Sequence, residues 1–149
     1  DDRDEQIVLF KKQLELAQRY NLPVIIHSRD ATEDTINILK NFKLKGVIHS
    51  FTGSYETAQI YLKMGFLLGI NGVITFKNCK LKEVVERLSL KNIVLETDSP
   101  YLTPVPFRGQ KNDSSHIVDI AQFIANLKNV TLEEVAQETT ANARQLFDF

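Results

Sequence analysis

The stretch Pro23-Val24-Ile25-Ile26-His27 shows the pattern that decides the fold, a short apolar run that ends on a polar side chain. Short runs rich in β-branched residues are typical of strands buried on both faces, as in parallel sheets. Three more such runs follow, and they are Gly46-Val47-Ile48-His49, Phe66-Leu67-Leu68-Gly69-Ile70 and Asn92-Ile93-Val94-Leu95-Glu96. The runs begin at residues 23, 46, 66 and 92, and each interval has room for one helix and two short loops.

The segments around these runs carry apolar residues at helical spacing. One helix is predicted before the first run and one in each interval, marked by Ile7, Phe10, Leu14 and Ala17, by Thr35, Ile38, Leu39 and Phe42, by Ala58, Tyr61 and Leu62, and by Leu81, Val84, Val85 and Leu88. Asp30, Ser54 and Asn78 stand where the helices in the intervals should be capped. Prolines 100, 104 and 106 predict a rigid loop after the last run, because proline cannot continue a helix or a central strand. Two helices are predicted beyond that loop, one over residues 115–127 and one opened by the capping box at Thr131.

Alternating strands and helices predict an α/β fold with a parallel sheet and right-handed crossovers. Both an open doubly wound sheet and a (β/α)8 barrel meet this description. A glycine-rich phosphate loop does not follow any of the runs, which disfavours a nucleotide-binding open sheet. Four strands are too few for a barrel, which takes about 250 residues, so the chain would supply half of one.

Composition sets limits on the class of protein. The 149 residues are 43% apolar and 25% charged, as in soluble globular domains, and no apolar run approaches the ~20 residues of a membrane helix. A formal charge of −1 argues against a general electrostatic clamp on nucleic acid. The one cysteine, Cys79, cannot form an internal disulfide, which favours a reducing, cytoplasmic location.

Polar side chains stand at the ends of three of the runs. His27 and His49 close the first and second runs, and Asp98 follows the fourth. Parallel α/β folds place ligands at the carboxyl ends of their strands. Imidazole and carboxylate together suit zinc, manganese or a similar divalent ion, while magnesium depends less on histidine. We therefore expect His27, His49 and Asp98 to converge on one metal ion.

Glu96 and Asp98 are two residues apart, so their side chains should point to one face. Two carboxylates so close would repel each other unless a cation or a basic group lies between them. We interpret Asp98 as a metal ligand or general base, and Glu96 as a catalytic-site group that orients a ligand or the substrate.

Two arginines are candidates for binding an anionic substrate. Arg108 lies in the proline-braced loop, and its planar guanidinium matches the oxygens of a phosphate. Arg29 follows His27 and could bind an anionic group in the same way. Asn71-Gly72, after the third run, is interpreted as a turn that supplies no metal ligand.

Six segments together resemble the TatD family, metal-dependent deoxyribonucleases on a TIM barrel. They are PVIIHSRDA (residues 23–31), GVIHSFTGS (46–54), NGVITFKN (71–78), ETDSPYL (96–102), PVPFRG (104–109) and TANARQLF (140–147). The likeness extends over essentially the whole chain.

The resemblance implies a hydrolase that cuts phosphodiester bonds in DNA with divalent ions (Mg, Mn or Zn) in a two-metal site. Carried over by position, His27, His49 and Asp98 are metal ligands. The family's other ligands, a His-x-His pair on the first strand and a Glu on the fourth, have no counterpart here. Residues 1–149 would therefore form the C-terminal half of a single barrel domain, strands five to eight, lacking its N-terminal half. We expect the isolated segment to be inactive or nearly so.

Two alternatives stay open from the residues alone. The same metal site could hydrolyse a small ester, lactone or amide. The segment could also be a non-catalytic half-barrel that associates with another chain through its open strand edges. The sequence leaves the oligomeric state open.

Overall fold

The computed structural model describes residues 2–149, and within them the chain forms a four-stranded parallel sheet in the order β1-β2-β3-β4. Each strand lies inside one of the predicted apolar runs. The strands are β1 (Val24–Ile26), β2 (Gly46–Ile48), β3 (Phe66–Ile70) and β4 (Ile93–Leu95). The prediction of a parallel α/β sheet is confirmed.

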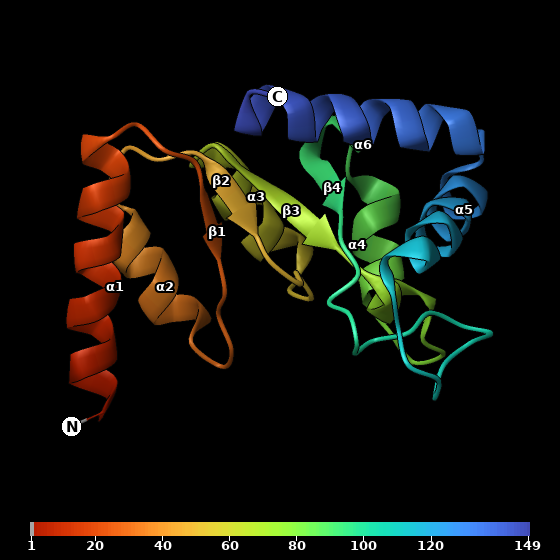
Figure 1. Ribbon diagram of the computed structural model, residues 1–149, viewed down its shortest axis with the longest axis horizontal. Coiled ribbons are helices and arrows are strands. Elements are labelled where there is room, and N and C mark those ends of the chain that lie inside the picture. Colours follow the sequence, from red (N-terminus) through yellow and green to blue (C-terminus); the bar gives the residue numbers. More distant parts are fainter. Residues whose placement is uncertain (1) are drawn as a thin grey trace.

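Helices connect the strands and flank the sheet (Figure 1). They are α1 (Asp2–Arg19), α2 (Thr32–Leu39), α3 (Tyr55–Lys63), α4 (Leu81–Arg87), α5 (Ile117–Lys128) and α6 (Leu132–Phe147), with 3-10 turns η1 (Gly72–Thr75), η2 (Leu90–Asn92) and η3 (Ser114–His116). In Figure 1, α1 and α2 lie at the β1 end of the sheet, and α5 and α6 lie at the β4 end. Among residues 2–149, no helix combines the length and the apolar character that crossing a bilayer requires.

Two of the predicted caps are confirmed and two are wrong. The Ser54 side chain accepts a hydrogen bond from the Thr57 amide, and Thr131 accepts one from the Glu134 amide. Asp30 does not cap α2, because it has a left-handed backbone (φ 51°) and the helix begins two residues later, whereas a cap residue needs extended geometry. Asn78 does not cap α4 either, because that helix begins at Leu81.

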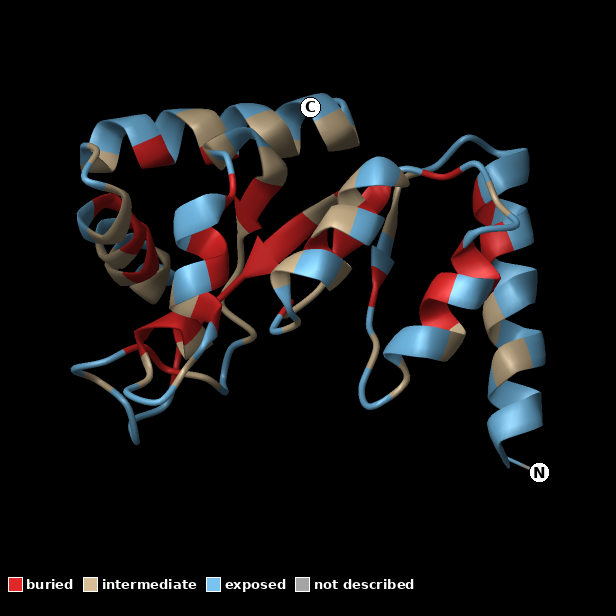
Figure 2. Cartoon of the chain, turned by 180° about the vertical axis from the view of Figure 1, so that it is seen from behind, coloured by how far each residue is buried: buried red, intermediate tan, exposed pale blue. Residues whose placement is uncertain are grey.

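The core lies between one face of the sheet and the helices. One row of this face runs across all four strands through paired residues Ile26, Ile48, Leu68 and Ile93, each at most 4% exposed. Residues of the opposite face are also covered in the middle of the sheet, but Ile25 on β1 is 64% exposed. Figure 2 shows this contrast between the buried β3 and the mixed colours of β1. Within residues 2–149, β1 pairs with β2 alone, so its other side is open.

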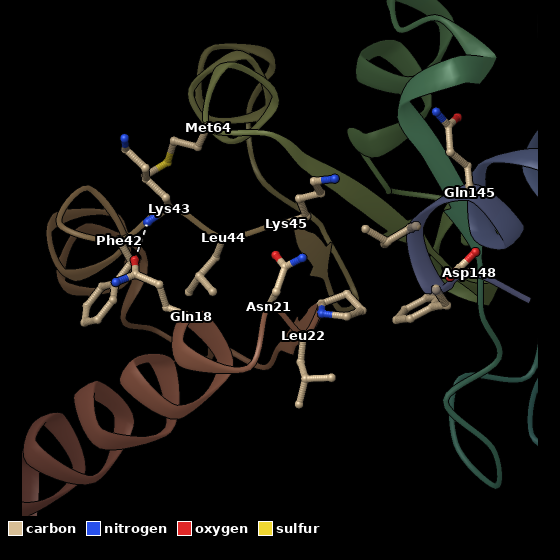
Figure 3. Close-up of a pocket in the computed structure, with 13 residues that line it drawn as sticks. Gln18, Asn21, Leu22, Phe42, Lys43, Leu44, Lys45, Met64, Gln145 and Asp148 are labelled. Atoms are coloured by element: carbon tan, nitrogen blue, oxygen red, sulfur yellow. Dashed lines mark hydrogen bonds between the residues drawn. The ribbon is translucent and has the colours of Figure 1, made fainter.

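A hollow of about 810 Å³ lies at the amino ends of the strands (Figure 3). Pro23 and Lys45, which precede β1 and β2, line it together with Phe147 at the end of α6. The predicted ligands follow the strands rather than precede them. The hollow therefore lies at the edge of the sheet opposite to the predicted ligands.

Candidate functional site

His49, Glu96 and Asp98 come together at the carboxyl ends of β2 and β4. The Nδ1 atom of His49 lies 2.9 Å from Oε2 of Glu96, and its Nε2 atom lies 3.1 Å from Oδ1 of Asp98. The three side chains are between 18% and 35% exposed. The sequence predicts that a cation or a basic group separates the two carboxylates, and the imidazole of His49 lies in that place.

Glu96 is held on both of its oxygens. Its Oε1 accepts hydrogen bonds from the Ser50 amide (2.5 Å) and from Nδ2 of Asn71 (3.2 Å), while its Oε2 faces His49. Asn71 is 2% exposed, and its Nδ2 also donates to Oγ of Ser50 at 2.8 Å. These contacts fix the carboxylate, and the carboxylate in turn fixes the ring of His49.

Gly69 on β3 makes room for Glu96. A Cβ atom at this position would stand 2.4 Å from Oε2 of Glu96, closer than two unbonded atoms can approach. The glycine therefore lets the carboxylate lie directly against the β3 backbone.

Two residues of the site have left-handed backbones, Ser50 (φ 51°) and Asp98 (φ 55°). Residues other than glycine seldom adopt this conformation, and it persists where the surrounding structure enforces it. Here the Ser50 amide is bound to Glu96, and the Asp98 carbonyl accepts a hydrogen bond from the Tyr101 amide at 3.0 Å.

His27 stands beside this cluster. Its ring stacks on that of His49, with centroids 5.4 Å apart and an interplanar angle of 29°. Within residues 2–149, however, no three His, Cys, Asp or Glu side chains are arranged to hold a metal ion. A metal site shared by His27, His49 and Asp98 stays a prediction. Of these three side chains, the structure brings His49 and Asp98 within hydrogen-bond distance.

The donor atoms of that pair fit a divalent cation. When His49 donates its Nδ1 proton to Glu96, the lone pair on Nε2 faces the carboxylate oxygen of Asp98, and a proton or a cation must lie between the two acceptors. Metal bonds of about 2.0–2.2 Å, at angles from 90° to about 109°, place two neighbouring ligand atoms about 2.8–3.6 Å apart. The observed 3.1 Å falls in that range.

The two predicted substrate-binding arginines lie in different settings. The guanidinium of Arg108 stacks on the ring of Phe76, 3.7 Å from its centroid. Arg29 is exposed and lines a shallow hollow of about 340 Å³ together with His27. Their roles stay predictions.

Sequence reasoning misses Ser50, Gly69 and Asn71. The turn predicted at Asn71-Gly72 is present, because Oδ1 of Asn71 accepts from the Val73 amide, but the same side chain also binds Glu96. Its place directly after β3, at the edge that bears His49 and Asp98, is the signal that points to it.

Comparison with known proteins gives a consistent result. The family model "TatD related DNase" matches residues 1–148. Among curated proteins, the metal-dependent hydrolase YabD of Bacillus subtilis is 48% identical over 149 residues, 97% of this chain and 58% of the relative. The metal-dependent hydrolase YcfH of Escherichia coli K12 is 42% identical over 142 residues, 93% of this chain and 54% of the relative.

Solved structures agree on the fold. The crystal structure of YjjV, a TatD homologue from E. coli K12, superposes with a TM-score of 0.91 at 32% identity over 98% of this chain and 57% of that one. An amidohydrolase from Saccharomyces cerevisiae shares the fold with a TM-score of 0.86 at 19% identity, over 99% of this chain and 60% of that one. The chain thus spans a little over half the length of the relatives that it matches. Because the family model matches almost every residue, the chain belongs to the TatD-related DNase family.

Proposed function

We propose that the protein carrying these residues is a metal-dependent hydrolase that cleaves phosphodiester bonds in DNA. The observation that carries the proposal is the His49 imidazole, held between the carboxylates of Glu96 and Asp98 at 2.9 and 3.1 Å. The family model's description names a DNase, and the curated relatives are named metal-dependent hydrolases. Both descriptions support the proposal.

His49 and Asp98, joined by His27, would hold a divalent ion, either Mg, Mn or Zn. Such an ion supplies an activated water and neutralises charge on the phosphate. Glu96 keeps the Nδ1 proton of His49 in place, so that Nε2 stays directed toward Asp98. The second carboxylate oxygen of Asp98 takes the proton of the attacking water. Arg108 and Arg29 would bind phosphate oxygens of the substrate.

We also propose that residues 1–149 are the C-terminal half of a single TIM-barrel domain, contributing strands five to eight. The relatives are covered over only 54–58% of their length, and the four parallel strands amount to half the number in such a barrel. The open edge of β1, which within residues 2–149 pairs with β2 alone, supports docking of further strands there, and the exposed side chain of Ile25 supports the covering of this end of the sheet. Those strands would belong to the same polypeptide or, in the non-catalytic alternative, to another chain.

The test compares substrates and removes the metal. The whole protein is stripped with EDTA, reloaded with Mg²⁺, Mn²⁺ or Zn²⁺, and assayed on single-stranded DNA and on p-nitrophenyl acetate. We expect metal-dependent DNA cleavage that falls at least about 100-fold in His49→Ala and Asp98→Asn. Chelator-resistant cleavage, or ester turnover without DNA cleavage, would overturn the proposed activity.

A separate assay addresses the half-barrel. A sample shown by intact mass to contain only residues 1–149 should be inactive or nearly so, because half of the ligands are expected elsewhere. Cleavage by that sample at the rate of the whole protein would refute this part of the proposal.

A further inference from the structure

The segment that follows β4 carries Asp98 and then returns toward η3 and the start of α5 (Figure 1). Asp98 has a left-handed backbone (φ 55°), and its Oδ1 lies 3.1 Å from Nε2 of His49. The angle φ sets how the peptide unit before a residue is turned relative to the side chain of that residue. Whatever holds the carbonyl of Thr97 therefore also sets where the Asp98 carboxylate points.

The side chain of Asn112 holds that carbonyl. Its Nδ2 donates hydrogen bonds to the Thr97 carbonyl at 2.8 Å and to the Tyr101 carbonyl at 2.7 Å, which uses both protons of the amide. The backbone amide of Asn112 donates to the Pro100 carbonyl at 3.1 Å. One residue that is only 2% exposed thus binds the chain on both sides of Asp98.

Residues 97–101 are tied to the rest of the chain by hydrogen bonds at two places. Within residues 2–149, one is the contact between Asp98 and His49, and the other is Asn112. The remaining hydrogen bonds of residues 97–101 run between members of the same segment. Asn112 is therefore the described residue that fixes the backbone of Asp98 from outside.

Asn112 is held in place by its neighbours on both sides. Before it, Oγ1 of Thr103 donates to the Gln110 carbonyl at 2.6 Å and closes the loop between these two residues. After it, the carboxylate of Asp113 accepts a hydrogen bond from the Ser115 amide at 2.8 Å and caps η3. Because η3 leads directly into α5, which contacts β4, the side chain of Asn112 is fixed relative to the strand.

The acceptor half of the same amide shows which half the fold uses. Oδ1 of Asn112 is buried and accepts no hydrogen bond within residues 2–149. A buried acceptor without a partner costs free energy, and such a group calls for an explanation. Here the cost is offset by the two hydrogen bonds that Nδ2 donates. The side chain therefore stabilises the segment around Asp98 through its donor.

We propose that Asn112 is a positioning residue of the site. By holding the carbonyls on both sides of Asp98, it keeps the left-handed backbone that directs the Asp98 carboxylate toward Nε2 of His49 and toward the ion proposed there. Asn112 is buried and acts through Asp98. This inference rests on the proposed function, in which Asp98 is a metal ligand and a base, and adds to it the residue that keeps Asp98 in place.

Asn142→Ala is the matched control for Asn112→Ala. Nδ2 of Asn142 also donates to two carbonyls, those of Leu90 and Ile93, at 2.7 and 2.8 Å, but at the amino end of β4. The two substitutions therefore remove the same number and kind of side-chain hydrogen bonds from opposite ends of one strand. Both should lower the midpoint of urea unfolding, and only Asn112→Ala should alter the site.

Two measurements report on the site without activity. In the 149-residue chain, proton–nitrogen correlation spectra should show the ring nitrogen resonances of His49 shifted or broadened by Asn112→Ala and unchanged by Asn142→Ala. In the whole protein, titration with Mn²⁺ should give a dissociation constant about 10–100-fold higher for Asn112→Ala than for Asn142→Ala, as expected for a residue that orients a metal ligand. In the same protein, kcat on single-stranded DNA should fall by about 10–100-fold with KM unchanged.

The proposal is overturned if the two alanine variants are folded and show the same His49 resonances and the same Mn²⁺ dissociation constant. If either alanine variant does not unfold cooperatively, Asn112→Ser and Asn142→Ser, which each keep a hydroxyl donor, take their place in the same comparison. Should the metal-loaded whole protein leave DNA uncut, the proposed activity fails, while the His49 resonances and the Mn²⁺ titration still decide the role of Asn112. The two failures are therefore distinguishable.

Discussion

Asn71→Ala tests whether the buried amide after β3 positions the site. The substitution removes two donated hydrogen bonds, to Ser50 and to Glu96, and one accepted from the Val73 amide. Asn71 is 2% exposed, so water cannot easily replace these partners. A neutral hydrogen bond contributes about 1 kcal/mol and one to a carboxylate about 1.5–3 kcal/mol. With allowance for relaxation, we expect the free energy of unfolding to fall by about 2–4 kcal/mol.

The Asn71→Ala substitution should also loosen the contact of His49, because Asn71 binds Glu96 and Glu96 binds His49. Without Asn71, Oε1 of Glu96 keeps the Ser50 amide as its remaining described donor, so the carboxylate is held less firmly against Nδ1 of His49. The expected result is that the ring nitrogen resonances of His49 shift or broaden relative to those of the wild-type chain. Proton–nitrogen correlation spectra of the imidazole ring report which nitrogen carries the proton.

The control is Asn78→Ala, an exposed asparagine beyond η1 that does not cap α4. Urea unfolding followed by far-UV circular dichroism gives the free energies, because the chain contains no tryptophan. The reasoning is refuted if Asn71→Ala unfolds within about 0.5 kcal/mol of Asn78→Ala and the His49 resonances are unchanged.

Three further predictions concern the same framework. Gly69→Ala places a Cβ 2.4 Å from Glu96 and should cost about 1–3 kcal/mol of stability, measured by chemical denaturation; an unchanged midpoint would contradict the packing argument. Asn142→Ala removes two hydrogen bonds, at 2.7 and 2.8 Å, from α6 to carbonyls in η2 and β4 and should lower the melting temperature, with exposed Gln137 as the control position. Hydrogen bonds from the side chain and amide of Ser115 hold the pKa of Asp113 below its ordinary value. The cap that Asp113 provides on η3 therefore stabilises the fold above the pKa of this carboxyl in the unfolded chain, and the stabilisation is lost as the pH falls through its pKa in the folded chain. The carboxyl carbon shift of Asp113, measured against pH, should show the lowered midpoint.

The strands could be predicted because each is a short apolar run whose ends are marked by a change in residue type. Their exact limits could not, since β1 pairs over three residues although its apolar run is longer. Asp30 and Asn78 are polar residues before a helix, but the backbone conformation that decides whether they cap it depends on the path of the loop. A left-handed residue such as Asp30 carries no sequence signal strong enough to identify it.

In the site, too, some features could be predicted from the sequence and others could not. That His49 and Asp98 meet could be predicted, because the carboxyl ends of parallel strands share one edge whatever fills the loops. The contacts of Glu96 with Ser50 and Asn71 could not, since they depend on where one carboxylate turns within an edge shared by three strands. Gly69 would have looked like a weak point in β3, whereas it is the residue that lets Glu96 approach.

The difference between His49 and His27 follows from the positions of their strands. His49 follows β2, which has neighbours on both sides, and its ring is bound at both nitrogens by groups that follow β4. His27 follows β1, which within residues 2–149 pairs on one side, beside an isoleucine that is 64% exposed. The direction of a metal-binding side chain is set by the residues that pack around its strand. In the proposed metal site, His49 and Asp98 are therefore paired where the described sheet is closed, and His27 stands apart where it is open. Covering the free side of β1 should bring His27 into position with His49 and Asp98.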